Sequence, residues 1–233
     1  MSTFVESHSE PLIFTLPEEL FLLSIDDSKG KLLTGSKDSL KFGMAGALLA
    51  SLALHERVKG EEKRLIVIDD APTGEALLDQ TLARIYAEKK PRKINHWIQI
   101  FANGKLINQT AEGLEARNII RIEKKRYLWV VPFELFPQVD ASAKFWVKQH
   151  LREAILAGHE VTPGMLAFLS LLKTCQMLNL VFTRDEEKAA AKKVATLVAG
   201  EVFGAAVAET LAEIDAATTA AVVVILAATS YSS

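Results

Sequence analysis

Apolar residues in the N-terminal part of the chain recur with the spacing of short helices. Residues 16–25 begin with a proline and two glutamates and place Leu20 and Leu23 on one side, which predicts a helix. Residues 26–30, with the sequence DDSKG, predict a turn. Residues 40–58 predict a second helix that is rich in Gly and Ala. Because small residues let neighbouring helices approach closely, we expect this second helix to lie at the centre of the fold.

The periodicity then changes to that of β-strands. Residues 57–68 (RVKGEEKRLIVI) combine two strand-like runs with a charged turn at 60–63, which predicts a β-hairpin. Helical spacing returns after it, and Thr73 or Asp70 is the expected N-cap of the next helix. Pro91 ends that helix, because proline cannot continue the backbone hydrogen bonding.

The rest of the chain repeats these two patterns. A second hairpin is predicted from strands at 119–122 and 127–133 around a turn at 123–126. Further helices are predicted for 94–101, 111–118, 140–157, 165–182, 186–197, 200–214 and 216–228. The predicted fold class is mainly α, with a helix bundle core surrounded by amphipathic helices and two short β-hairpins. We expect residues 1–11 to form a flexible N-terminal arm and residues 12–233 to form a single helical domain.

The composition is that of a folded chain without a bulk charge preference. Of its 233 residues, 49% are hydrophobic and the formal net charge is −2, which excludes disorder of the whole chain. General nucleic-acid binders usually carry a basic excess, which this chain lacks. The uncharged stretch 216–233 has its strongly apolar part at 220–228, far shorter than the roughly 20 residues that cross a bilayer. We therefore interpret it as a buried helix rather than a membrane anchor.

Sequence motifs for catalysis and cofactor binding give no positive signal. The chain contains no GxxxxGK[ST] or GxGxxG loop, no GxSxG motif and no HExxH or paired CxxC motif. We therefore expect no catalytic residue, no cofactor and no metal. Cys175 lies in an apolar stretch, which favours a buried structural thiol over a nucleophile. Asp69 and Asp70 follow a β-branched run, as carboxylates do in α/β enzymes, but turn and cap roles are favoured because no parallel sheet is predicted.

Two local basic clusters stand out from the neutral average. Residues 84–93 carry five basic side chains against Glu88, and residues 115–126 carry five against Glu115 and Glu123. Such clusters orient proteins on anionic membranes, although an ordinary solvated face has the same composition. The second cluster and its hairpin also fit a winged-helix nucleic-acid reader, a reading weakened because the helix predicted before the hairpin is short and half acidic.

Several segments, in order along the chain, resemble the Golgi phosphoprotein 3 family. The most specific is DAPTG followed by LLD at 77–79, and together the segments extend over roughly residues 12 to 228. The segments are LPEELFLLSIDDSKG (16–30), GMAGALLASLALHERV (43–58), DDAPTGEALLDQTL (69–82), NHWIQIF (95–101), REAIL (152–156) and MLAFLSLLKTCQMLNLVF (165–182).

This resemblance implies a mainly α-helical domain around a four-helix bundle. It also implies a peripheral membrane protein that binds phosphatidylinositol 4-phosphate in a shallow basic pocket, beside a hydrophobic hairpin that enters the bilayer. The phosphate is then held by charge-assisted hydrogen bonds, while the apolar hairpin adds burial energy.

The resemblance assigns one Trp and three Arg to this pocket, and this chain keeps none of the four. The Trp position falls near Thr34 or Gly35, the first Arg at Ala45, and the other two Arg near Gly104 and Ile107. The membrane hairpin, placed by the resemblance after the apolar segment ending at 182, is reduced to the charged sequence TRDEEK.

The nearest cationic substitutes are Lys37, Lys41 and Lys105, which we predict as the residues that bind a lipid head group. Lysine is a poorer bidentate phosphate partner than arginine, so weaker affinity or a different ligand is expected.

The sequence therefore predicts a non-enzymatic peripheral membrane protein that binds an anionic phospholipid head group, by resemblance a phosphoinositide. It is expected in the cytoplasm, attached to membranes, and on the cytosolic face of the Golgi in a eukaryote. Further partners are protein tails or a second copy of the chain, and no nucleic acid. The alternatives are a protein–protein adaptor that has lost lipid binding and the winged-helix-like nucleic-acid binder.

Overall fold

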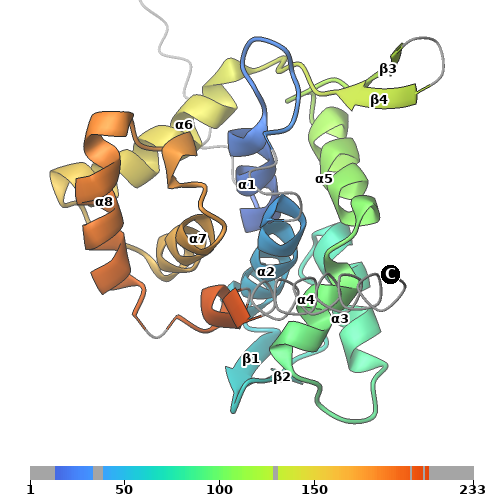
Figure 1. Ribbon diagram of the computed structural model, residues 1–233. Helices are drawn as coiled ribbons and strands as arrows, with labels where there is room; N and C mark the ends of the chain where they lie inside the picture. Colours follow the sequence, from blue (N-terminus) through green and yellow to red (C-terminus); the bar gives the residue numbers. More distant parts are fainter. Residues whose placement is uncertain (1–13, 34–38, 128–130, 200, 207, 210–233) are drawn as a thin grey trace, which may run out of the picture.

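Helices make up most of the protein in its computed structural model, which describes residues 14–33, 39–127, 131–199, 201–206 and 208–209. Two antiparallel hairpins accompany the helices within these residues, which confirms the predicted fold class (Figure 1). The helices are α1 (Leu16–Ser24), α2 (Ser39–Leu54), α3 (Ala76–Tyr86), α4 (Ile94–Phe101), α5 (Gly104–Ala116), α6 (Ala141–Arg152), α7 (Pro163–Thr174) and α8 (Arg184–Leu197). The hairpins are formed by β1 (Val58–Glu61) with β2 (Arg64–Val67), and by β3 (Glu123–Tyr127) with β4 (Val131–Leu135).

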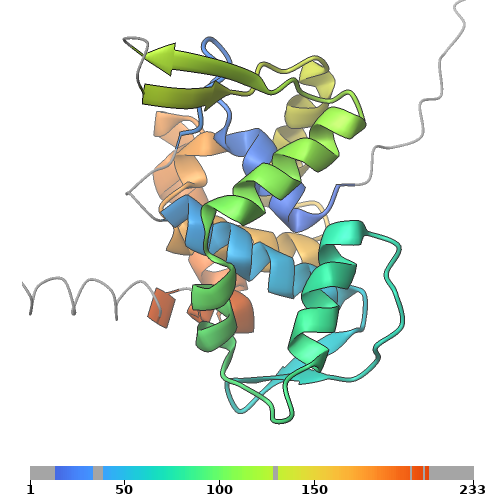
Figure 2. The ribbon, with the colours of Figure 1, turned by 90° about the vertical axis from the view of Figure 1, so that its right-hand side faces the viewer.

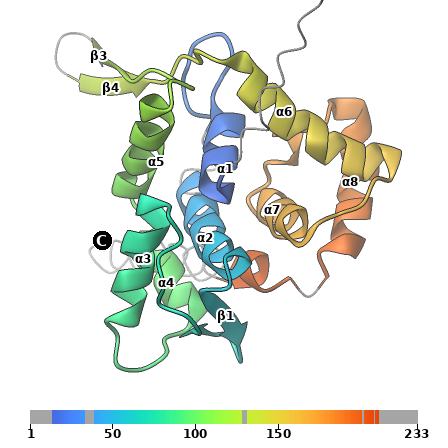
Figure 3. The same cartoon turned by 180° about the vertical axis from the view of Figure 1, so that it is seen from behind.

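Helix α2 is the central element, as its density of small residues predicts. It is buried along nearly its whole length, and α1, α4, α5 and α7 pack against it. Helices α3, α4 and α5 lie on one flank of α2, and α6, α7 and α8 lie on the other, as Figure 1 and Figure 3 both show. Gly43 shows why a small residue is needed here, because a Cβ at this position would lie 2.9 Å from Cys175 Sγ and 3.1 Å from Leu20 Cδ2.

Helix α1 is joined to the end of α5 by an ion pair whose carboxylate is buried. The backbone N–H of Thr15 donates to the Glu18 carboxylate at 2.9 Å, which satisfies one amide at the start of the helix. Arg117, just after α5, donates to both carboxylate oxygens of Glu18 at 3.1 Å and lies 4.8 Å from the Phe14 ring. Glu18 is buried, so removing Arg117 would leave an uncompensated charge inside the protein.

The first predicted hairpin is confirmed, with a tighter turn than expected. Strands β1 and β2 pair from Val58 opposite Val67 to Glu61 opposite Arg64, so only Glu62 and Lys63 form the turn. Their φ angles of 49° and 61° match a type I′ turn, which fits the twist of the strands.

The second hairpin is shifted along the chain relative to the prediction. Residues 123–126, predicted as its turn, belong to strand β3, which pairs with β4 from Glu123 opposite Leu135 onward. Charged residues suit this strand because Lys125 and Arg126 face solvent, and Lys124 lies 4.0 Å from Glu134 across the pair.

Two helix starts also differ from the prediction. Helix α5 begins at Gly104 instead of 111, because the Asn103 side chain accepts a hydrogen bond from the backbone N–H of Leu106 at 3.2 Å. Helix α3 starts after Glu75, so neither Thr73 nor Asp70 is its N-cap. Instead, the Thr73 hydroxyl donates to Asp79 at 2.7 Å and holds the preceding loop against the helix.

The C-terminal half follows the prediction with local irregularities. Helix α6 continues into a π-helical turn at Glu153–Ala157, and a 3₁₀ turn at Leu178–Leu180 follows α7 instead of a continuous helix to residue 182. The TRDEEK segment is no hairpin, because α8 starts inside it at Arg184. Of the last two predicted helices, 202–206 is helical, and residues 216–228 lie outside the described residues, as do residues 1–11. The structure contains, in its described part, no helix with the length and hydropathy to cross a membrane.

Replacing Gly43 by Ala should destabilise the protein by about 1–3 kcal/mol, because the added Cβ overlaps the Cys175 sulfur. Adding Cys175→Ala should recover part of this loss, so that the two changes together cost less than their sum in a urea unfolding experiment. The control is Gly104→Ala, whose Cβ would meet nothing within 4 Å. Equal destabilisation by both glycine substitutions would contradict close packing at Gly43.

The ion pair between α6 and α8 should make stability depend on pH in the acid range. Arg152 donates to Glu186 at 2.6 Å, and this hydrogen bond lowers the pKa of Glu186 to about 2 from its ordinary 4.5. A lowered folded-state pKa adds stability that is complete above the unfolded pKa and is lost as the pH falls toward 2. Urea unfolding between pH 6 and pH 2, a range set by that pKa, should therefore show a smaller acid loss for Glu186→Gln than for the wild type. Glu187→Gln, which removes a neighbouring carboxylate without an ion pair among the described residues, should retain the wild-type dependence.

Candidate functional site

The positions that the resemblance assigns to a phosphate pocket do not form a cationic site among the described residues. Ala45 is fully buried in α2, Gly104 is exposed at the start of α5, and residues 34 and 35 lie outside the described residues. Ile107 lines a cavity of about 480 Å³ together with apolar residues that include Phe133 and Phe136 and with Lys124 and Glu134, which lie 4.0 Å apart. A phosphate there would meet one lysine that already has a carboxylate beside it.

Of the three predicted lysines, the structure describes Lys41 and Lys105, and these two line no common cavity. Lys37 lies outside the described residues. Lys41 is half-buried in the first turn of α2, and Lys105 is exposed in the first turn of α5. Of Lys41 and Lys105, only Lys105 lines the groove between α3 and α5 that is described in the next paragraph.

A groove of about 270 Å³ runs between α3 and α5, and we call it the α3–α5 groove. Its floor is apolar and its rim is polar, and the side chains that line it include no carboxylate. The lining residues are Leu48, Leu77, Gln80, Thr81, Arg84, Ile100, Phe101, Asn103, Lys105, Leu106 and Gln109. The two cations at its rim, Arg84 and Lys105, come from different helices.

Hydrogen bonds fix the polar wall of the α3–α5 groove. Gln109 Nε2 donates to Gln80 Oε1 at 3.1 Å and so connects α5 with α3. Asn103 Nδ2 donates to the carbonyl of Ile100 at 2.9 Å, while Asn103 Oδ1 caps α5. Because both ends of the wall are held, the rim has a defined geometry before any ligand arrives.

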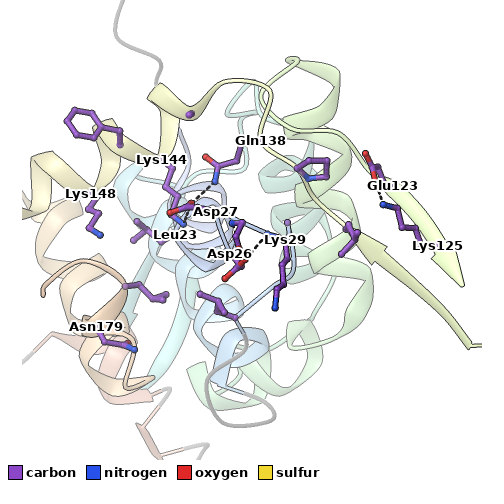
Figure 4. Close-up of a pocket in the computed structure, with 18 residues that line it drawn as sticks. Leu23, Asp26, Asp27, Lys29, Glu123, Lys125, Gln138, Lys144, Lys148 and Asn179 are labelled. Atoms are coloured by element: carbon purple, nitrogen blue, oxygen red, sulfur yellow. Dashed lines mark hydrogen bonds and ion pairs between the residues drawn. The ribbon is translucent and has the colours of Figure 1, made fainter. Parts of the chain in front are cut away.

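A larger cavity, of about 790 Å³, lies between the turn after α1, hairpin β3–β4 and α6 (Figure 4). It contains two ion pairs: Lys144 lies 2.7 Å from Asp27, and Lys125 lies 2.9 Å from Glu123. The hydrogen bond from Lys144 lowers the pKa of Asp27, with a smaller contribution from Gln138, so this carboxylate is ionised. Lys29, Lys148 and Asp26 also line the cavity, so it has room for a ligand and carries charges of both signs.

The aspartates considered as catalytic groups have structural partners. Asp69 pairs with Arg57 at 2.9 Å and accepts a hydrogen bond from the backbone of Ala71 at 3.0 Å. Asp70 is exposed in the same turn. Across the described residues, no group of three or more His, Cys, Asp or Glu side chains is arranged to hold a metal ion. The geometry thus favours the turn role for both aspartates.

Within each of the two basic clusters, the side chains have different neighbours in the fold. In the first cluster Arg92 pairs with Glu88 at 3.3 Å, while Arg84 turns to the α3–α5 groove. In the second, Arg117 is taken up by the buried Glu18. Arg84 is the residue that sequence reasoning missed as a site residue, because its only signal was membership of a basic cluster.

The sequence of this chain is similar to a protein family and to a curated protein. A family model described as Golgi phosphoprotein 3 (GPP34) matches residues 16–214. The chain is also similar to vacuolar protein sorting-associated protein 74 from Eremothecium gossypii, with 27% identity over 192 residues, covering 70% of this chain and 57% of that protein. The chain thus spans a little more than half the length of this curated relative.

Cys175 is buried, and burial raises the pKa of its thiol to about 12, which confirms the predicted buried thiol. We expect the thiol in the native protein to react with an aromatic disulfide reagent only as fast as the protein unfolds, since little thiolate exists near pH 8 at such a pKa. The same protein in denaturant should react at once and stoichiometrically. Rapid reaction of the native protein would instead show an accessible thiolate.

Proposed function

The chain belongs to the Golgi phosphoprotein 3 family, and from this membership we propose that it is a peripheral membrane protein of trafficking that binds an anionic phospholipid head group. The observation that carries the proposal is the family match over residues 16–214, which includes all the helices α1 to α8. Phosphatidylinositol 4-phosphate is the proposed lipid, attachment to the cytosolic face of a membrane is the proposed location, and the protein's work is proposed to be non-catalytic.

The arrangement of the surface supports contact with a membrane. Hairpin β3–β4 stands at the end of the molecule opposite to hairpin β1–β2 (Figure 2). Lys124 and Arg126 are exposed on β3. Basic side chains near an anionic bilayer each contribute about 1 kcal/mol of attraction, so a few of them suffice for reversible association.

The residues proposed to contact the head group remain Lys37, Lys41 and Lys105. Lys105 is the best supported of these, since it is exposed at the start of α5, where the first backbone N–H groups of a helix have no intrahelical partner. A single lysine holds a phosphate less tightly than a cluster of arginines, so we expect a weak, salt-sensitive interaction.

A second candidate function is a protein–protein adaptor without lipid binding. It is favoured by one observation: the positions of the missing arginines hold Ala45, Gly104 and Ile107, of which Ala45 is inaccessible. In this case the chain would retain the fold of its family and bind partners through its surface alone.

Vesicle flotation distinguishes the two functions. The chain should float with phosphatidylcholine vesicles that contain phosphatidylinositol 4-phosphate, and less with vesicles that contain phosphatidylserine at equal total charge or phosphatidylcholine alone. Raising the salt concentration should weaken the association.

Lys105→Glu should reduce flotation, whereas Lys188→Glu, an equal change of charge at an exposed position of α8, should not. Failure of the wild-type chain to float with any vesicle would remove the membrane proposal and favour the adaptor.

A further inference from the structure

We propose that the outer edge of strand β2 and the cavity beside it bind an extended acidic peptide of a partner protein. The cavity has a volume of about 190 Å³ and is lined by residues of β2, of the end of α3 and of the segment before α4. We call it the β2-edge site. Hairpin β1–β2 stands at the end of the molecule opposite to hairpin β3–β4 (Figure 2), so the site is separate from the surface proposed to meet a membrane.

The backbone groups at this edge of β2 are only partly paired. The N–H of Leu65 donates to the carbonyl of Arg92 at 2.9 Å, so residues 92–94 begin a third strand beside β2. The N–H of Ile68 points to the other side, where it donates to the residue that precedes β1 at 2.9 Å. Because N–H groups alternate between the two sides of a strand, the N–H of Val67 faces the same side as that of Leu65, and it has no partner among the described residues. An extended peptide can continue the third strand there.

A buried donor without an acceptor belongs to the same cavity. Trp97 lines it, and the indole Nε1 of Trp97 is buried with no hydrogen-bond partner among the described residues, although a buried N–H normally has one. The ring is stacked on Phe101, with the ring centroids 5.7 Å apart. A peptide carbonyl in the cavity would supply the missing acceptor. The two unpartnered donors of the site, on Trp97 and Val67, thus both select carbonyl oxygens.

The charge around the site selects acidic side chains. Lys89 and Lys90 are exposed and form no ion pair among the described residues, and Lys90 lines the cavity. The acidic residue of this basic segment, Glu88, already lies 3.3 Å from Arg92. Acidic residues beside the bound segment would therefore be attracted to the lysines, which favours both association and the choice of partner.

The size of the cavity favours a peptide side chain over a small molecule. Its volume of about 190 Å³ is below the roughly 300 Å³ at which small-molecule pockets begin, but it has room for one or two side chains. Ile85 and Val67 give it an apolar lining, and Tyr86, which is 60% exposed, lines it as well. Since successive side chains of a strand point to opposite faces, the expected ligand has an apolar residue between two acidic ones.

The first test selects ligands for the full chain from a displayed library of short random peptides. The recovered peptides should carry a β-branched residue between acidic residues, because the apolar side chain enters the cavity and its neighbours face the lysines. Recovery of basic peptides, or of no peptide above background, would overturn the inference.

The affinity of a selected peptide is then measured by fluorescence anisotropy. Lys90→Glu should weaken binding about tenfold, since it repels the acidic residues of the peptide. Lys188→Glu, an equal change of charge at an exposed position of α8, should bind as the wild type does. Equal loss in both variants would indicate diffuse charge attraction and overturn the inference.

Methylation of the peptide backbone tests strand addition. Two versions of the peptide carry an N-methyl group at one or the other of two adjacent central residues. One of them should no longer bind, because only alternate N–H groups face β2. Undiminished binding of both versions would exclude pairing with the strand edge.

The indole N–H resonances of isotope-labelled protein report on the unpartnered donor directly. The signal of Trp97, identified by its loss in Trp97→Phe, should shift when the peptide is added, because its N–H acquires an acceptor. The signal of Trp146, which is 41% exposed on α6, should not. A bound peptide that leaves the Trp97 signal unchanged lies elsewhere, and the inference then fails.

Vesicle flotation separates this inference from the proposed function, on which it does not depend. Lys90→Glu should lose peptide binding and still float as the wild type does. If it loses both, the basic segment is part of the membrane surface, and the inference fails while the membrane proposal stands. A chain that binds the peptide but floats with no vesicle supports the inference and removes the membrane proposal.

Discussion

The close packing of α2 against its neighbours is the constraint on which the rest of the structure depends. Gly43 leaves room for Cys175 and Leu20, and the buried Ala47, one turn further along, continues the same small surface. Helices can approach this closely only where side chains are small, and the burial gained there is the main source of stability for the short helices around it. The two flanks, α3 to α5 and α6 to α8, are arranged around this shared helix.

The same packing explains where cationic residues can and cannot act. Position 45, where the family resemblance expects an arginine, belongs to the core of this chain, and a guanidinium there would be costly to bury without a partner. Several other charges are paired within the described residues, as Arg117 with Glu18 and Lys144 with Asp27 demonstrate. In the α3–α5 groove, by contrast, the two cations share a surface with amide, hydroxyl and apolar side chains and with no carboxylate.

Elements with a continuous hydrophobic face were predicted well, and elements whose stability comes from packing were not. Helix α4 has the predicted bounds, 94–101, because its apolar residues recur at helical spacing. The first turns of α5 are polar in sequence, and their helical state depends on burial of Leu106 and Thr110 and on the cap by Asn103. The charged run at 123–126 resembles a turn when read alone, but it is stabilised as a strand by pairing with β4.

The sequence by itself determined the helical class, the central position of the small-residue helix, the family, and the loss of the expected arginines. These follow from local spacing and residue identity, which report on burial within single elements. Only the tertiary structure decided that Lys105 and Arg84 line one groove, that Arg117 pairs with the buried Glu18, and that Lys41 does not line the groove of Lys105. The reason is that a site depends on which faces of separate helices meet, and the pattern along one helix does not specify its neighbour.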